Sequence, residues 1–174
     1  NGSSIYVTFE TRNYDGKLIS IVDGERTTIV SGLQKPDGLT TSLGSLVYTQ
    51  ESGESPVYEV INGVPRGLFI TDGAEGIDSA LNGDLYVIED RLGGRVLKYE
   101  RSTGKISVLA SELEAGEGIC VMESGAVYFA ERDKGIVYKI ENGEISEYLT
   151  ALSKPGFLLC DDESQSIWIT EDRR

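Results

Sequence analysis

Residues 75–109 read EGIDSALNGDLYVIEDRLGGRVLKYERSTGKISVL and contain one complete copy of a repeat that runs through the chain. A glycine opens a short apolar segment, an Asn-Gly turn follows, and a second apolar segment ends at Glu89. Two further short segments are joined by a turn at Thr103-Gly104. Short apolar segments that alternate with tight-turn residues predict four antiparallel β-strands in this stretch.

The same arrangement recurs along the whole chain. Five short segments place apolar or β-branched residues before a glutamate, at a period near 40 residues. These glutamates are Glu10, Glu51, Glu89, Glu131 and Glu171. No segment has the apolar period of an amphipathic helix, so we expect no helix. Four short antiparallel strands in each repeat are typical of a β-propeller blade, and the sequence therefore predicts one all-β propeller domain or segment over residues 1–174.

The order of the expected strands indicates how much of a ring is present. Turn residues divide the chain into three strands, then three complete four-stranded units, then two final strands, which makes seventeen. The strand that ends in glutamate occurs at both ends of this series, which a closed four-bladed ring would not carry. We therefore expect about four blades of a larger ring, with the remaining blades or a protein partner covering the open ends.

The composition excludes several classes of function. Among 174 residues there are 16 Lys and Arg, 29 Asp and Glu and no His, which gives a formal net charge of −13. This charge argues against binding to nucleic acid or anionic lipid. No apolar run is long enough to cross a bilayer. The lack of His excludes Ser-His-Asp and Cys-His catalysts and His metal ligands. We expect Cys120 and Cys160 to be buried free thiols, with a disulfide as the alternative.

Acidic residues also repeat at the start of the first strand of each unit, at Asp37, Glu75 and Glu117. Because the first and second strands are antiparallel, the end of one lies beside the start of the other. The sequence therefore predicts an acidic mouth on one face of the ring, and oxygen ligands of this kind suit Ca²⁺ or Mg²⁺. The candidate metal ligands are Glu89, Glu131, Glu51, Glu75, Glu117 and Asp37. The alternative is that these glutamates cap backbone N–H groups of neighbouring blades and bind nothing.

The repeat resembles the NHL / SMP-30–gluconolactonase group of β-propellers. The resemblance lies in residues 75–77, 82–89, 94–99 and 102–105, and in Lys35-Pro36-Asp37-Gly38-Leu39, although this chain has Glu where the group usually has Asp. From the resemblance alone we expect a ring of six blades. Lactonases of the group bind a divalent metal through a motif similar to Gly53-Glu54-Ser55-Pro56-Val57-Tyr58, but here that motif follows the second strand and opens the third.

These observations leave two classes of function open. The first is a non-catalytic binding or assembly module with an acidic, cation-binding channel mouth, and a small-molecule ligand is compatible with it. The second is a divalent-metal-dependent hydrolase of the lactonase type. The regular repeats and the lack of His favour the first class. An extracytoplasmic location is expected, because acidic propellers of this kind are often exported and the sequence starts at Asn1.

Overall fold

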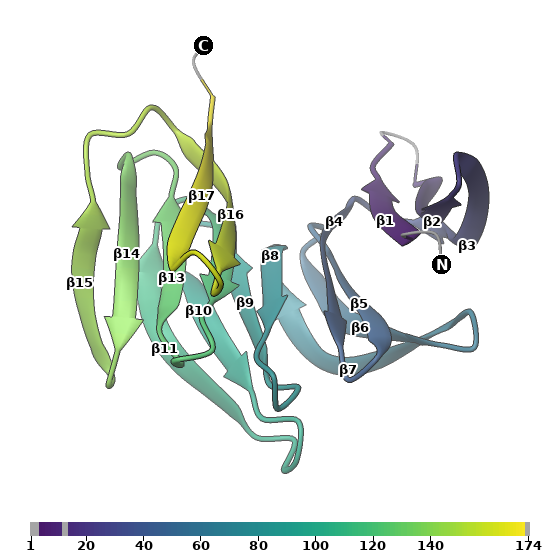
Figure 1. Ribbon diagram of the computed structural model, residues 1–174, viewed down its shortest axis with the longest axis horizontal. Helices are drawn as coiled ribbons and strands as arrows, with labels where there is room; N and C mark the ends of the chain where they lie inside the picture. Colours follow the sequence, from purple (N-terminus) through teal and green to yellow (C-terminus); the bar gives the residue numbers. More distant parts are fainter. Residues whose placement is uncertain (1–3, 12–13, 173–174) are drawn as a thin grey trace.

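The computed structural model describes residues 4–11 and 14–172, which form β-strands connected by tight turns (Figure 1). Within these residues there is no helix, as the sequence predicted. The strands are β1 (Ser4–Phe9), β2 (Gly16–Val22), β3 (Glu25–Leu33), β4 (Pro36–Ser42), β5 (Ser45–Gln50), β6 (Glu54–Ile61), β7 (Val64–Asp72), β8 (Ala74–Ser79), β9 (Leu85–Glu89), β10 (Gly94–Tyr99), β11 (Ile106–Leu113), β12 (Gly116–Val121), β13 (Val127–Glu131), β14 (Ile136–Glu141), β15 (Glu144–Leu149), β16 (Pro155–Asp161) and β17 (Ser166–Glu171).

Hydrogen bonding groups the strands into five antiparallel sheets that follow one another in chain order. We call them the first to fifth blades: β1–β3, β4–β7, β8–β11, β12–β15 and β16–β17. The turns at Asn62-Gly63 and Asn142-Gly143 join the third and fourth strands of their blades, and all four residues have positive φ, as two-residue hairpin turns require. The predicted division into three strands, three full blades and two strands is confirmed.

The innermost strands β4, β8, β12 and β16 lie side by side, which arranges the blades as successive blades of a propeller. Close approach of these strands depends on a glycine at the third position of β4, β8 and β12. A Cβ atom on Gly76, for example, would lie 2.6 Å from the carbonyl oxygen of Glu117 in the next blade. The fifth blade has Phe157 at the equivalent position, because Leu158 pairs with Ile169 as Ile119 pairs with Phe129.

The hydrophobic core lies between the blades. Each of four apolar clusters contains residues of two neighbouring sheets. Between the third and fourth blades, Tyr86 and Ile88 pack with Ile119 and Phe129. The stability of each blade therefore depends on the burial of its apolar faces by its neighbours, as in other repeat proteins.

The two ends of the series are open. The first blade begins at its second strand, the fifth blade consists of two strands, and the described residues of these two sheets form no strand pairs with each other. Trp168 in the fifth blade is 64% exposed, whereas Tyr128, its equivalent in the fourth blade, is 7% exposed beneath the fifth. The chain is thus an open segment of a propeller, as predicted.

The expectation of free thiols is wrong. Cys120 in β12 and Cys160 in β16 form a disulfide, with Cα atoms 5.5 Å apart. Their separation of 40 residues is close to one repeat, so the two cysteines fall on neighbouring innermost strands. The bond joins the two-stranded fifth blade covalently to the fourth.

Candidate functional site

Strand pairing separates the repeated acidic residues into two rows that differ by one position. Gln50, Glu89, Glu131 and Glu171 each pair with the first residue of the innermost strand of their own blade. We call these four residues the cap row. The residue after each belongs to a second row, which contains Glu51 and Asp90. In the second blade the strand therefore ends at Gln50, one residue before the predicted Glu51.

The first blade follows the same shifted pattern. The Thr8 hydroxyl donates to the carbonyl oxygen of Asp37, as the Thr49 hydroxyl donates to that of Glu75. Thr8 and Thr49 are therefore equivalent, and so are Glu10 and Glu51. β1 ends at Phe9, one residue before the predicted Glu10.

Each member of the cap row accepts a hydrogen bond from a backbone N–H at the end of the preceding blade. The donors are the N–H groups of Gln34 to Gln50 at 2.7 Å, Asp72 to Glu89 at 3.0 Å, Glu114 to Glu131 at 2.7 Å and Ser153 to Glu171 at 2.6 Å. Glu89 is completely buried and also accepts two hydrogen bonds from Arg95, and Glu131 pairs with Lys134 at 2.7 Å. The oxygens of Glu89 and Glu131 thus hold neighbouring blades together.

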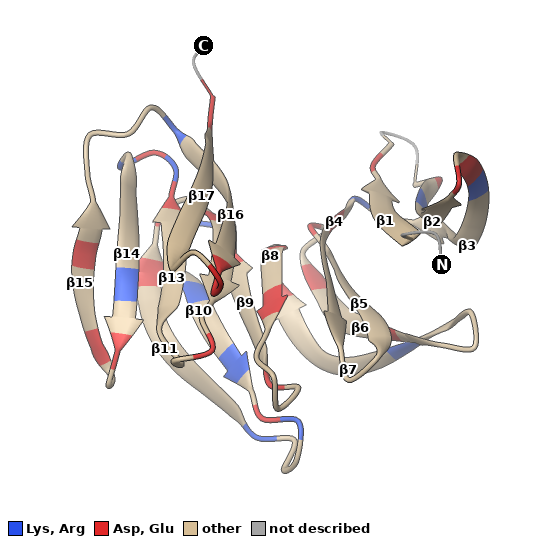
Figure 2. Ribbon diagram, in the orientation of Figure 1, with Lys and Arg blue, Asp and Glu red and all other residues tan. Residues whose placement is uncertain are grey.

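Three of the other predicted residues come together. Asp37 and Glu75 are the second residues of β4 and β8, and Glu51 follows β5. One carboxylate oxygen of each lies within 4.8 Å of the other two. We call this group the acidic triad, and Figure 2 shows the distribution of acidic residues along the ribbon. The Lys35 Nζ atom is 2.9 Å from Glu51, so the ammonium group of a lysine lies at the edge of the triad.

Burial and like charges raise the pKa values of two triad carboxyls. The pKa of Asp37 is raised to about 6, mainly by burial and further by the charges of Glu51 and Glu10. The pKa of Glu75 is raised to about 9, first by burial and then by the charges of Asp37, Glu117 and Glu51. The two side chains are hydrogen-bonded to each other. Near neutral pH this pair therefore keeps a proton that a bound cation would replace.

Glu117, the equivalent of Glu75 in the fourth blade, has a different environment. Its carboxylate accepts a hydrogen bond from Arg132, which also lies 3.7 Å from Asp90. Burial raises the pKa of Glu117, and Arg132 opposes this shift. In the fifth blade Gly156 occupies the equivalent position. Among the residues from 4 to 172 that are described, the uncompensated part of the acidic mouth thus lies at the second and third blades.

A cavity of about 300 Å³ adjoins the triad. Asp37 contributes to its lining, together with apolar residues of the innermost strands such as Leu39, Ile77, Ile119 and Phe157. The arrangement can hold a hard cation at the carboxylates, since Ca²⁺ and Mg²⁺ prefer oxygen ligands. It could equally bind an organic cation, whose charge would meet the carboxylates while its apolar part contacts the apolar walls of the cavity.

The lactonase-like motif lies elsewhere. Gly53-Glu54-Ser55-Pro56-Val57-Tyr58 enters β6, which is the third strand of its sheet, and Glu54 is exposed. This placement agrees with the phase expected from the sequence, and the motif does not join the triad.

Sequence reasoning missed two features of the site region. Gln50 takes the place of a capping glutamate. The signal in the sequence is that a Gln, whose side-chain oxygen can also accept a hydrogen bond, stands immediately before Glu51. The cations that accompany Glu89 and Glu131, Arg95 and Lys134, come from the following turn or strand at different offsets, so no fixed spacing marks them.

Comparisons with known proteins support the fold. No protein-family model matches this chain, and no curated protein matches its sequence. A chain of a nidogen/laminin complex matches with a TM-score of 0.80 and 16% identity, over 98% of this chain and 70% of that chain. A structure described as a gluconolactonase matches with a TM-score of 0.71 and 13% identity, over 88% of this chain and 63% of that chain.

A third similar structure is that of virginiamycin B lyase from Staphylococcus aureus, with a TM-score of 0.69 and 18% identity, over 98% of this chain and 68% of that chain. These similar structures are β-propeller proteins, in agreement with the group that the repeat resembles. The protein is therefore an all-β propeller segment. At identities this low the similarity concerns the fold, and function has to be argued from the site.

Proposed function

We propose that this chain is the larger part of a non-catalytic β-propeller binding module whose acidic mouth binds a divalent cation through Asp37, Glu51 and Glu75. The observation that carries the proposal is the convergence of three carboxylate oxygens from two neighbouring blades within 4.8 Å. Like charges held this close repel each other, and a cation between them removes the repulsion.

The chemistry of the triad favours Ca²⁺ or Mg²⁺. The ligands are carboxylate oxygens only, since the chain has no His and both cysteines are in a disulfide. Zn²⁺ usually takes nitrogen or sulfur ligands in proteins, whereas Ca²⁺ takes six to eight oxygens and tolerates irregular geometry. Backbone carbonyl groups and water would complete the coordination.

The partners of the two open ends are further blades, in the same polypeptide or in another chain. Trp168 occupies a position that the next blade buries in the third and fourth blades. This chain covers 70% of the matched chain of the nidogen/laminin complex, so 30% of that chain has no counterpart here. A ring of six blades is what the resemblance of the repeat implies.

Calorimetric titration of Ca²⁺ and Mg²⁺ into the chelator-treated protein tests the cation site. We expect heat of binding in the unmodified protein and at least a tenfold loss of affinity in Asp37→Asn and in Glu75→Gln. Glu131→Gln is the matched control, because it also removes one buried carboxylate but leaves the triad intact. Absence of binding to the unmodified protein would refute the proposal, and equal losses in all three variants would place the site elsewhere.

A lactonase-type hydrolase is the second candidate. The raised pKa of Glu75, about 9, is the kind of perturbation that accompanies acid–base catalysis. Assay of lactone hydrolysis with Ca²⁺, Mn²⁺ or Zn²⁺ distinguishes the two candidates. Turnover that disappears with a chelator and in Glu75→Gln would support the hydrolase, whereas binding of Ca²⁺ without turnover would support the binding module.

The location of the protein follows from a separate observation. A disulfide such as Cys120–Cys160 persists in oxidising compartments and is rare in the cytosol. We therefore infer an extracytoplasmic location. Among the described residues, no helix has both the length and the apolar character needed to span a membrane.

A further inference from the structure

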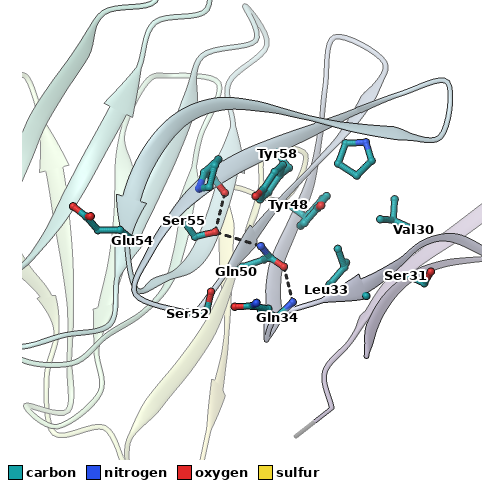
Figure 3. A pocket seen from close by; sticks show the side chains of 13 residues that line it. Val30, Ser31, Leu33, Gln34, Tyr48, Gln50, Ser52, Glu54, Ser55 and Tyr58 are labelled. Atoms are coloured by element: carbon teal, nitrogen blue, oxygen red, sulfur yellow. Dashed lines mark hydrogen bonds between the residues drawn. The ribbon is translucent and has the colours of Figure 1, made fainter. Parts of the chain in front are cut away.

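A groove of about 500 Å³ lies between the first and second blades (Figure 3). No residue of the acidic triad lines it, although its lining residues Gln50 and Ser52 flank Glu51. One wall is formed by the end of β3, including Val30 and Leu33, and the other by β5 and β6, including Tyr48, Gln50 and Tyr58. The rings of Tyr48 and Tyr58 stack with their centroids 5.2 Å apart. The volume falls in the range of pockets that bind small molecules.

The repeat provides internal comparisons for this groove. Val30, Phe69 and Ala110 are equivalent, because they pair with Leu18, Val57 and Val96, which are all completely buried. In the second blade the large ring of Phe69 stacks on Tyr99 of the third blade, with centroids 4.6 Å apart. Between the third and fourth blades the corresponding pocket is about 170 Å³. The first groove is larger even though Val30 is bulkier than Ala110, so the size of this residue alone does not set the volume. At the equivalent position of the second blade, the larger Phe69 packs against the next blade through its contact with Tyr99.

The charge in the groove also differs from that at the other interfaces. Glu89 pairs with Arg95, and Glu131 with Lys134, at the corresponding places. Here Gln50 donates to the Ser55 hydroxyl at 3.3 Å and accepts from the Gln34 N–H, as the dashed lines in Figure 3 show. Glu54 is the one charged residue in the lining. Apart from the exposed carboxylate of Glu54, the side chains that line the groove are therefore uncharged.

Tyr48 has an unused hydrogen-bonding group. Its side chain lines the groove although the residue is only 1% exposed. Its hydroxyl has no hydrogen-bond partner among residues 4–11 and 14–172, and no described polar side-chain atom is both fully buried and unpaired. The Tyr48 hydroxyl therefore remains accessible to a bound molecule or to water.

We propose that this groove binds a neutral, hydroxyl-rich ligand of about the size of a disaccharide. The Tyr48 hydroxyl and the uncharged side chains of Ser31, Gln34 and Ser52, which also line the groove, can donate and accept hydrogen bonds, which matches the hydroxyls of a sugar. Tyr58, Pro56 and Pro65 supply the apolar surface that a sugar ring needs on its other face. Anionic ligands are disfavoured by Glu54 and by the net charge of −13.

Saturation-transfer NMR and calorimetry with maltose and cellobiose, at up to about 10 mM, test the proposal. We expect binding to the unmodified protein that a chelator does not change, which separates this site from the cation site. Val30→Phe, which copies Phe69, should weaken binding at least tenfold, and Tyr48→Phe should weaken it about threefold. Ala110→Phe makes the same type of change in the smaller groove and should leave binding unchanged.

The outcomes against the proposal are equally defined. It is refuted if neither sugar binds, or if Val30→Phe binds as tightly as the unmodified protein. Binding of a decaproline peptide in preference to both sugars would assign the groove to peptide recognition instead. Melting temperatures of all variants establish that a lost signal does not arise from unfolding, and Tyr48→Phe, which hardly alters volume, serves where Val30→Phe is unstable.

Discussion

The cap row and the acidic triad consist mostly of carboxylates at the same end of the blades, in opposite environments. Glu89 and Glu131 each receive a backbone N–H and a cationic side chain, so their charges are compensated. Asp37 and Glu75 face each other and Glu51, and burial and repulsion raise their pKa values. A carboxylate in this fold therefore stabilises the blades where N–H groups or cationic side chains surround it, and is available to a ligand where its neighbours are other carboxylates.

The reason for the difference is geometric. Successive residues of a strand point to opposite faces. A residue in the cap row points to the preceding blade, where a backbone N–H group at the end of the last strand donates to its side-chain oxygen. The residue after Gln50, Glu51, lies at the mouth, where it meets Asp37 and Glu75 from the starts of the innermost strands. The comparison predicts opposite effects of removing charge from the two groups.

The largest expected effect is that of Glu89→Ala. This substitution leaves the Asp72 N–H without its acceptor and Arg95 without its partner, and the residue is completely buried. We expect a loss of about 3 kcal/mol in the free energy of unfolding. Glu89→Gln should lose about 1 kcal/mol or less, because Gln50 already performs the same capping in the second blade.

Urea denaturation with a chelator present measures both changes. Equal losses in Glu89→Ala and Glu89→Gln would show that the charge of Glu89, and its pairing with Arg95, matter more than the cap. No loss in either variant would contradict the structural role of the cap row.

In the triad, by contrast, removal of charge should stabilise the protein, and this effect should appear as a dependence of stability on pH. A carboxyl whose pKa is raised on folding contributes stability that is fully present below its ordinary pKa and is lost as pH rises through the raised value. The cation-free protein should therefore lose stability from about pH 5 to pH 9, since the raised pKa values are about 6 for Asp37 and about 9 for Glu75.

Comparison with Glu75→Gln isolates this contribution, because Asp78 and Asp90, whose pKa values are also raised by burial, are retained in the variant. Denaturation at pH 5, 7 and 9 should show a smaller loss in Glu75→Gln, and saturating Ca²⁺ should reduce the loss in the unmodified protein. A larger loss of stability between pH 5 and pH 9 in Glu75→Gln would show that the charge of Glu75 does not destabilise the folded protein.

Much of the fold could be predicted from the sequence, because turn residues mark the strand ends. Asn62-Gly63 and Asn142-Gly143 fix the hairpins, and the number and order of strands follow from such signals. The register could not be predicted by the same means. Whether Gln50 or Glu51 pairs with Pro36 depends on hydrogen bonds across the sheet, and the more obvious glutamate suggested the wrong alignment.

The site was predicted in part for the same reason. The starts of the innermost strands, Asp37 and Glu75, were placed at the mouth because antiparallel strands must bring their ends together. The compensation of Glu117 depends on Arg132, which stands where the second and third blades have acidic residues. The disulfide carried a readable signal, since Cys120 and Cys160 are separated by about one repeat.

The smallest expected effect concerns Lys35, the one cation that touches the acidic triad among the described residues. Its ammonium group is 2.9 Å from Glu51, and the two side chains are 47% and 29% exposed. Solvent screens such a pair, so Lys35→Gln should change the free energy of unfolding by less than about 1 kcal/mol. The same substitution removes a charge that competes with a bound cation, and affinity for Ca²⁺ should rise, by about threefold.

Calorimetry at low and high salt checks this prediction, since the gain should shrink as ionic strength increases. Lys105→Gln is the matched control, because Lys105 forms a comparable exposed pair with Glu100 in the third blade without touching the triad. Its affinity for Ca²⁺ should stay close to that of the unmodified protein. Weaker binding in Lys35→Gln would mean that Lys35 positions Glu51 for the cation. In that case the ion pair would be part of the site. Lys35 would then hold Glu51 in place as Arg95 and Lys134 hold Glu89 and Glu131.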